Sequence, residues 1–239
     1  MARGELPALG RAFDKVLPKV RRDIEKKVLD KFSEAKNIQL VQRTLVQPFA
    51  NAYLTGKQTG WIVHGTILGA PDSLNAREIR KWLEAAMAHG DLIANRFRRL
   101  LEAEPTVAEL RQHVLKAGEQ SVWQGQDDAA REVATLAEAE WKEWVRAWPR
   151  TEHRDWHDAL EGVVIPEEHF FTLPGGKNAG AQVYGPRDWE RVTDPGEWIN
   201  CGHALVYHRD VTQADLEQTV QGLGTVYRPP TRSRVWASP

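Results

Sequence analysis

The sequence has little of what disulfide-rich, membrane-spanning or strongly charged proteins contain. One cysteine among 239 residues excludes an internal disulfide and favours a reducing compartment. No apolar run approaches the roughly 20 residues of a membrane-spanning helix, so we expect no membrane partner. The 32 Lys and Arg nearly balance the 33 Asp and Glu, so bulk charge gives no argument for binding nucleic acid.

Common phosphate-binding and metallohydrolase motifs are missing as well. The chain contains neither GxxxxGK[ST] nor GxGxxG nor HExxH, the patterns that mark those sites. Tryptophan is abundant instead, with ten residues against two methionines. Because tryptophan anchors cores and interfaces, we favour a protein that works through contacts with others, and we expect it not to be an enzyme.

The first two thirds of the chain carry apolar residues at helical spacing. The predicted helices cover residues of about 7–35, 38–67, 75–104, 106–116 and 127–148. Thr106 and Glu109 have the spacing of a capping box. Glycines at 56, 60 and 65 either weaken the second helix or mark close packing.

The last predicted helix would place Trp141, Trp144 and Trp148 on one face, where we expect them in the core. After residue 149, short β-type runs at 162–165, 170–173, 181–184 and 204–207 alternate with glycine and proline turns. A short helix is predicted at about 212–221, and prolines prevent a helix in the tail that follows.

These patterns predict an α+β protein. A long helical region covers residues 1–148, a small β-rich module covers 149–222, and an extended arm covers 223–239. The arm ends in a basic and aromatic segment, and we expect an interface at Arg232, Arg234 and Trp236.

Two helical segments have opposite charge. Residues 1–36 hold ten basic and six acidic side chains, a net charge of +4, and residues 102–143 hold ten acidic and four basic ones, a net charge of −6. Either both are solvated helix faces, or they dock copies of the chain head to tail. The basic residues of the first helix that are candidates for contacting DNA are Lys15, Lys19, Arg22 and Lys26.

Three potential metal ligands occur in the second half of the chain. His157, Cys201 and His203 supply nitrogen and sulfur of the kind zinc prefers, provided that the backbone turns at Gly202. Candidates for a fourth ligand are His153, Asp158 and Glu161. The alternative is two satisfied histidines and a small buried cysteine.

The same residues allow a nucleophile. His157 or His203 could activate Cys201, with Asp155 or Asp158 orienting the base. A chain with eight histidines can combine a cysteine, a histidine and a carboxylate by chance, so we favour the metal site over the nucleophile.

The order of features in the second half resembles a known family. It runs through Arg154-x-x-His157, Leu160-Glu-Gly162-Val, Phe170-Phe171, Tyr184-Gly-Pro186 and Asn200-Cys-Gly-His203. This order is similar to the C-terminal domain of the minor head, or head morphogenesis, proteins of tailed bacteriophages, the phage Mu F-like family. The resemblance covers about residues 140–210, and the preceding part is similar only in being helical.

The resemblance implies a structural virion protein without catalytic activity. It would be made in the cytoplasm of a bacterial host and would lie in the capsid interior or at the portal vertex, acting in capsid assembly and in genome packaging or ejection. The implied partners are the portal protein and the major capsid or scaffold protein. Double-stranded DNA and further copies of the chain are additional candidates because of the charge of the helical segments, not because of the resemblance.

One departure from the family bears on the metal. Where the family has Asn-Cys-Arg-Cys, this chain has Asn200-Cys201-Gly202-His203. His203 stands where the family has its second cysteine, and both side chains can bind metal. This exchange favours a structural zinc site that stabilises a small module. Two other functions stay open: a metal-dependent hydrolase or nuclease that uses His157, Cys201 and His203, and an adaptor protein unrelated to phages.

Overall fold

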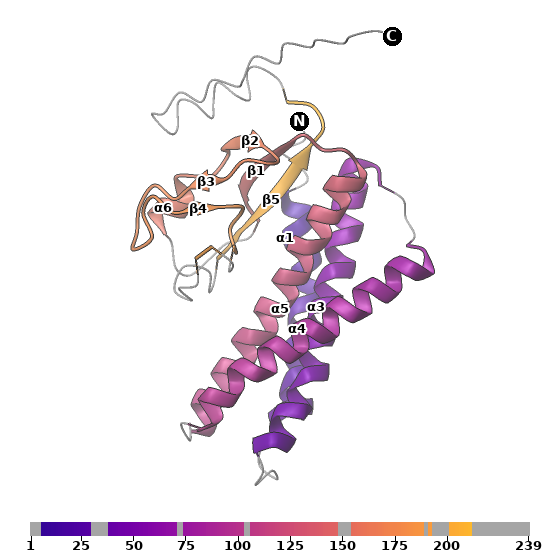
Figure 1. Cartoon of the computed structure of the whole chain (residues 1–239), viewed down its shortest axis with the longest axis vertical. Helices are drawn as coiled ribbons and strands as arrows, with labels where there is room; N and C mark the ends of the chain where they lie inside the picture. The colour runs from indigo at the N-terminus through magenta and orange to yellow at the C-terminus, as the bar shows by residue number, and fades with distance from the viewer. Residues whose placement is uncertain are drawn as a thin grey trace.

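The computed structural model describes residues 6–29, 38–70, 74–102, 106–147, 154–188, 191–192 and 201–211. This part of the chain is mostly helical and carries a small antiparallel sheet near its C-terminal end, which confirms the α+β class (Figure 1). The helices are α1 (Leu6–Ile24) with a π-helical extension η1 (Glu25–Leu29), α3 (Ile38–Leu68), α4 (Ala76–Glu102), α5 (Val107–Leu136) and the short α6 (Asp155–Asp158). The strands are β1 (Trp141–Arg146), β2 (Val164–Pro166), β3 (Phe171–Thr172), β4 (Gln182–Val183) and β5 (His203–His208).

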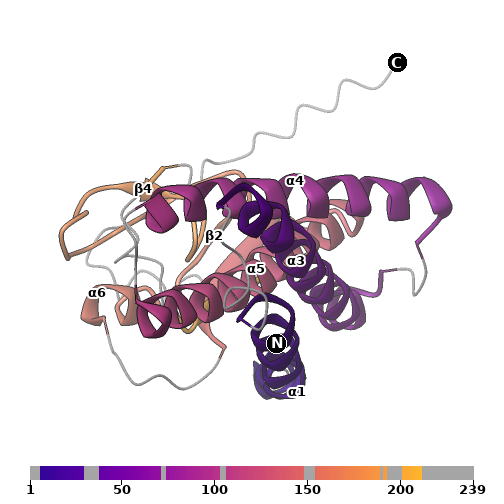
Figure 2. The ribbon, with the colours of Figure 1, turned by 90° about the horizontal axis from the view of Figure 1, so that it is seen from below.

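Helices α3 and α5 form the centre of the helical layer. Helix α4 packs on α3, and α1 contacts both α3 and α5. Seen from below, α1 and α4 lie on opposite sides of the central pair (Figure 2). Within the described residues, no helix combines the length and apolar character needed to cross a membrane.

Glycines allow α3 and α5 to approach closely. A Cβ atom on Gly56 would overlap the backbone of Val122, and one on Gly125 would overlap the backbone of Tyr53. By contrast, a Cβ on Gly65 would meet only the Cβ of Ala70, at 3.8 Å. Of the two alternatives for the glycines of α3, close packing is therefore correct at Gly56.

Helix α5 begins as the sequence predicts. The Thr106 hydroxyl accepts a hydrogen bond from the Glu109 amide, and the Glu109 carboxylate accepts one from the Thr106 amide, which confirms the capping box. The helix continues without a break to Leu136, so the separate helices predicted at 106–116 and 127–148 are wrong. It stops because Glu138 takes a left-handed backbone conformation, with φ of 52°.

The predicted helix over the tryptophans is wrong for a second reason. Trp141 and Trp144 lie in β1, the middle strand of a sheet ordered β2-β1-β5, and Trp148 lies outside the described residues. In this strand Lys142 pairs with Ile165 on one side and with Tyr207 on the other. The three-stranded sheet therefore includes Trp141–Arg146, a segment that the sequence pattern placed in the helical region.

The sequence predicted the remaining strands correctly: β2, β3, β4 and β5 each overlap one of the four β-type runs. Strands β3 and β4 form a separate two-stranded sheet. One core cluster joins the helices to Val145 and Val206 of the sheet, and a second joins α5 to Trp144 and Phe171. The predicted helix at 212–221 and the arm with Arg232, Arg234 and Trp236 lie outside the described residues.

Candidate metal centre

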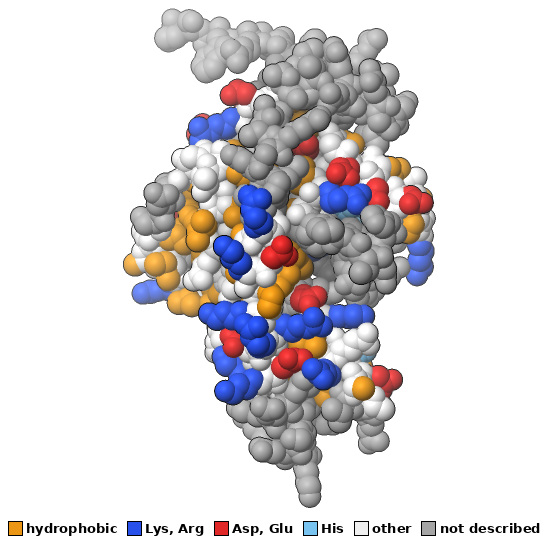
Figure 3. Space-filling model, turned by 180° about the vertical axis from the view of Figure 1, so that it is seen from behind, with side chains coloured by type: hydrophobic (Ala, Val, Ile, Leu, Met, Phe, Trp, Pro, Cys, Tyr) orange, Lys and Arg blue, Asp and Glu red, His pale blue; other side chains and the backbone are white. Residues whose placement is uncertain are grey.

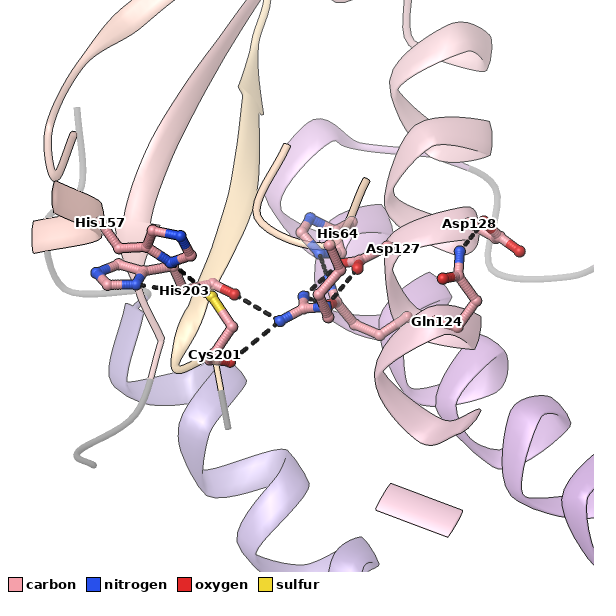
Figure 4. A network of polar contacts seen from close by, with 9 residues as sticks. His64, Gln124, Asp127, Asp128, His157, Cys201 and His203 are labelled. Atoms are coloured by element: carbon pink, nitrogen blue, oxygen red, sulfur yellow. Dashed lines mark hydrogen bonds and ion pairs between the residues drawn. The ribbon is translucent and has the colours of Figure 1, made fainter. Parts of the chain in front are cut away.

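Three predicted ligands meet in the interior of the β-rich module. The Cys201 Sγ atom lies 3.3 Å from His157 Nδ1 and 3.9 Å from His203 Nδ1. One ligand atom from each residue lies within 4.8 Å of the others. His157 and His203 are 0% exposed and Cys201 is 3% exposed (Figure 4). This cluster can bind a metal ion.

Local backbone geometry brings the ligands together. The Arg154 carbonyl accepts hydrogen bonds from the His157 and Asp158 amides and so begins α6, which carries His157. Cys201 and His203 are two residues apart at the start of β5, and alternate residues of an extended chain share one face. The Gly202 carbonyl accepts a hydrogen bond from the Ala147 amide at 2.9 Å, which keeps this segment beside the end of β1.

Trp144 forms one wall of the cluster. Its ring centroid lies 5.4 Å from that of His157, 6.0 Å from that of His203 and 5.2 Å from that of Phe171. Trp144 is fully buried, as its predicted core role requires. Its bulk holds both imidazoles in place and excludes water from them.

The candidates for a fourth ligand have other positions. Asp158 Oδ1 lies 3.4 Å from His203 Nε2, the imidazole nitrogen that does not face Cys201, and accepts a hydrogen bond from Arg146 at 2.9 Å. Glu161 accepts from Arg146 at 3.1 Å on an exposed side of the module, and His153 lies outside the described residues. Asp158 therefore lies behind His203, on the side from which carboxylates orient metal-bound histidines.

Burial argues against the nucleophile alternative. Asp155 is exposed at the start of α6, whereas Cys201, His203 and Asp158 lie in the order that a nucleophile, a base and an orienting carboxylate require. Complete burial of His157 and His203 keeps a substrate away from Cys201. This burial thus favours ligation over attack on a substrate.

A buried arginine that sequence reasoning missed joins the cluster to α5. Arg187 donates to the main-chain carbonyls of His203 at 2.7 Å and Cys201 at 3.3 Å. Its Nε and Nη2 atoms donate to the two oxygens of Asp127, each at 2.6 Å. Burial works against the charge on Arg187, but Asp127 outweighs it and raises the pKa of the guanidinium. The one feature of the sequence that could have drawn attention to Arg187 is its place in the turn Pro186-Arg187-Asp188, which follows Tyr184.

The same arginine connects the cluster to α3. Arg187 Nη2 lies 3.4 Å from Gln126 Oε1, and Gln126 Nε2 lies 2.9 Å from His64 Nε2 (Figure 4). Burial lowers the pKa of His64 to about 4, so this histidine is neutral at pH 7. A continuous line of polar contacts therefore crosses from the candidate ligands to the centre of the helical layer.

Lys142 is a second buried cation that the sequence did not reveal. Its side chain is 0% exposed, and its Nζ atom lies 3.2 Å from the centroid of the Tyr184 ring and 5.6 Å from that of Phe171. Among the described residues, no hydrogen-bond acceptor faces this Nζ atom. Burial, opposed by attraction from Glu167, lowers the pKa of Lys142 to about 7.

The candidate DNA contacts occupy another part of the molecule. Lys15, Lys19, Arg22 and Lys26 are all exposed on α1 and its π-helical extension, whereas the candidate ligands lie in the β-rich module. The candidate DNA contacts and the candidate metal ligands therefore lie in two separate regions of the molecule.

Comparison of the chain with family models, with curated proteins and with solved structures gives no match. The function must therefore be argued from the residues of the chain and from their geometry.

Proposed function

We propose that this protein is a structural component of a tailed-bacteriophage head, and that a zinc ion at His157, Cys201 and His203 stabilises its C-terminal module. One observation carries the proposal: the separate motifs of the resemblance converge in space. Arg154-x-x-His157 and Cys201-Gly-His203 are 44 residues apart, yet their side chains meet. The turn after Tyr184 supplies Arg187, which binds the backbone of that same centre.

The distances between ligand atoms support zinc. A Zn–S bond of about 2.3 Å and a Zn–N bond of about 2.05 Å at a tetrahedral angle separate sulfur from nitrogen by about 3.6 Å. The observed separations of 3.3 and 3.9 Å lie on either side of this value. All three ligand atoms lie within 4.8 Å of one another, and binding would bring the two imidazole nitrogens to about 3.3 Å apart at the bond lengths above.

Burial supports a structural role for the metal rather than a catalytic one. A catalytic zinc keeps a position open to water or substrate, whereas a structural zinc is enclosed. The three ligands are 0–3% exposed, and Trp144 covers both imidazoles. This burial favours the structural protein over the metal-dependent hydrolase or nuclease. The described residues supply three ligands, and a structural zinc requires a fourth.

A bound zinc ion would add to the stability that the β-rich module gains from the helices. The sheet has three strands and its neighbour has two, and both share their core clusters with the helical layer. With the metal bound, the module presents a rigid surface to the portal protein and the major capsid or scaffold protein, the partners we propose.

Quantitative mass spectrometry of purified intact particles from the source tests the role in the virion. The measurement compares this chain with the portal and major capsid proteins. We expect a low, constant copy number relative to the major capsid protein. Absence of the chain from both mature particles and assembly intermediates would overturn the virion role.

Metal analysis of the full chain, purified without chelator, tests the zinc site separately. We expect one equivalent of zinc in the wild-type protein and in His208→Ala, a control in the same strand whose Nε2 atom contacts Glu143 at 2.9 Å instead. Cys201→Ser and His203→Ala should lose the metal and unfold at lower temperature. Well under one equivalent in the wild-type protein would refute the zinc site and leave the virion role to its own test.

A further inference from the structure

A row of basic side chains follows the exposed side of α1 and continues into η1. Four positions on α1, spaced three or four residues apart, fall within an arc of about 80° on a helix of 3.6 residues per turn, and with the fifth position in η1 the row is about 22 Å long. The five exposed residues of this row are Arg11, Lys15, Lys19, Arg22 and Lys26. The opposite side of the helix carries the buried Phe13, Val20 and Ile24, so this row points into solvent.

The charges of this row are not neutralised within the described part of the chain. No ion pair or hydrogen bond between described residues engages any of the five side chains. The neighbouring Glu25 binds Arg111 of α5 at 2.6 Å, and Asp14 and Asp23 lie about 60° and 40° outside the arc. The row therefore presents five positive charges to an external partner.

Part of the acidic segment is engaged within the protein. Asp127 binds Arg187, and Asp128 accepts a hydrogen bond from Tyr53 at 2.5 Å. Glu132 binds Lys57 at 2.6 Å. These three carboxylates are therefore poor partners for the row. Glu102 and Glu138 of the same segment are exposed, so docking of an acidic protein surface is the alternative that the test below must separate from DNA binding.

A groove beside the row adds to the positive surface. It lies between α1 and α5, has a volume of about 760 Å³ and is lined by Arg21, Arg111 and Lys116, with Glu119 as its acidic member. Figure 3 views the molecule from the side on which α1 lies, and Lys and Arg side chains gather across the middle of this face. The basic surface is therefore broader than one helix.

We propose that this face of α1 binds the phosphate backbone of double-stranded DNA without sequence preference. A duplex carries one negative charge per about 1.7 Å of its axis, so a length of 22 Å presents about 13 phosphates to the five cations. Contacts of Lys and Arg with phosphate oxygens position a protein on the duplex without reading its sequence. The inference depends on charge and exposure and stands independently of the virion role and of the zinc site.

Fluorescence anisotropy of a labelled mixed-sequence duplex, titrated with the full chain at several salt concentrations, tests the proposal. Five phosphate contacts predict a slope of log K against log salt of about −4.5, which is a loss of about 500-fold in affinity between 50 and 200 mM salt. The triple variant K15Q/K19Q/R22Q should reduce the slope by about 2.7. A second duplex of different sequence should bind equally well.

A matched control removes the same charge from the other side of the molecule. The triple variant R77Q/R80Q/K81Q changes three exposed residues of α4, and it should keep the wild-type slope. Equal weakening by both triple variants would overturn the proposal, because binding would then follow net charge. Binding of poly-glutamate as tight as that of the duplex would also overturn it, in favour of an acidic protein partner.

Discussion

Replacing Lys142 with methionine should remove a pH dependence from the stability of this protein. The Lys142 side chain is fully buried, and its pKa falls from 10.5 to about 7 on folding because burial disfavours the charge. Between these two values the unfolded chain binds the proton more tightly than the folded one. The free energy of unfolding of the wild-type protein should therefore rise as the pH rises from about 7 towards 10.5.

The size of this effect follows from the two pKa values. Each pH unit well inside the interval contributes up to about 1.4 kcal/mol. Near pH 7 the lysine of the folded protein is half protonated. The free energy of unfolding therefore rises by only about 2 kcal/mol between pH 7 and pH 9. Methionine has nearly the same length and cannot titrate, so the Lys142→Met protein lacks this contribution.

Urea unfolding at pH 7, 8 and 9, followed by tryptophan fluorescence, measures the difference. The difference in free energy of unfolding between Lys142→Met and wild type should shrink by about 2 kcal/mol over this range. Lys81→Met, which alters an exposed lysine of α4, should give a constant difference. Parallel profiles for wild type and Lys142→Met would show that Lys142 keeps its charge on folding, and the reasoning from burial would be wrong.

Three further predictions concern packing and polar contacts. Arg187→Met should lower the free energy of unfolding by about 3–5 kcal/mol because it leaves Asp127 buried without its partner. Urea unfolding of Arg187→Met, Asp127→Asn and the double variant should show that the double variant loses less than the sum of the two single losses. Gly56→Ala should lower the thermal midpoint sharply, because its Cβ would overlap Val122, whereas Gly65→Ala should leave it unchanged or raise it. Asp158→Asn should weaken zinc binding about tenfold in a chelator competition while leaving the far-UV spectrum intact.

Much of the fold could be predicted from local sequence patterns. Apolar spacing located α3 and α4 to within one or two residues, and the Thr106–Glu109 pair located the start of α5. The β-type runs between turns located β2 to β5. These features depend on neighbours in the chain, which is why the sequence reveals them.

The main error was the strand β1. Its tryptophans at 141 and 144 imitate helical spacing, whereas its actual neighbours, β2 and β5, are distant in the sequence. Pairing on both sides decides the conformation of this segment, and no local pattern records that pairing.

The candidate site was predictable in its ligands and not in its surroundings. His157, Cys201 and His203 stand out because few residue types bind metals. Arg187 and Lys142 did not stand out, since arginine and lysine are usually exposed and only the folded chain shows that they are buried. The four predicted basic residues of α1 share one exposed side, because helical spacing alone determines that arrangement.

The close crossing of α3 and α5 has a mechanical consequence. With Gly56 against Val122 and Gly125 against Tyr53, the backbone of each helix sits in a notch of the other, so the pair resists sliding along its length. Helix α3 has 31 residues and is therefore about 46 Å long. The interlocked region begins after Pro48 of α3, so the part of the helix pair nearest the sheet (Figure 1) is the part in which the two backbones cannot slide past each other.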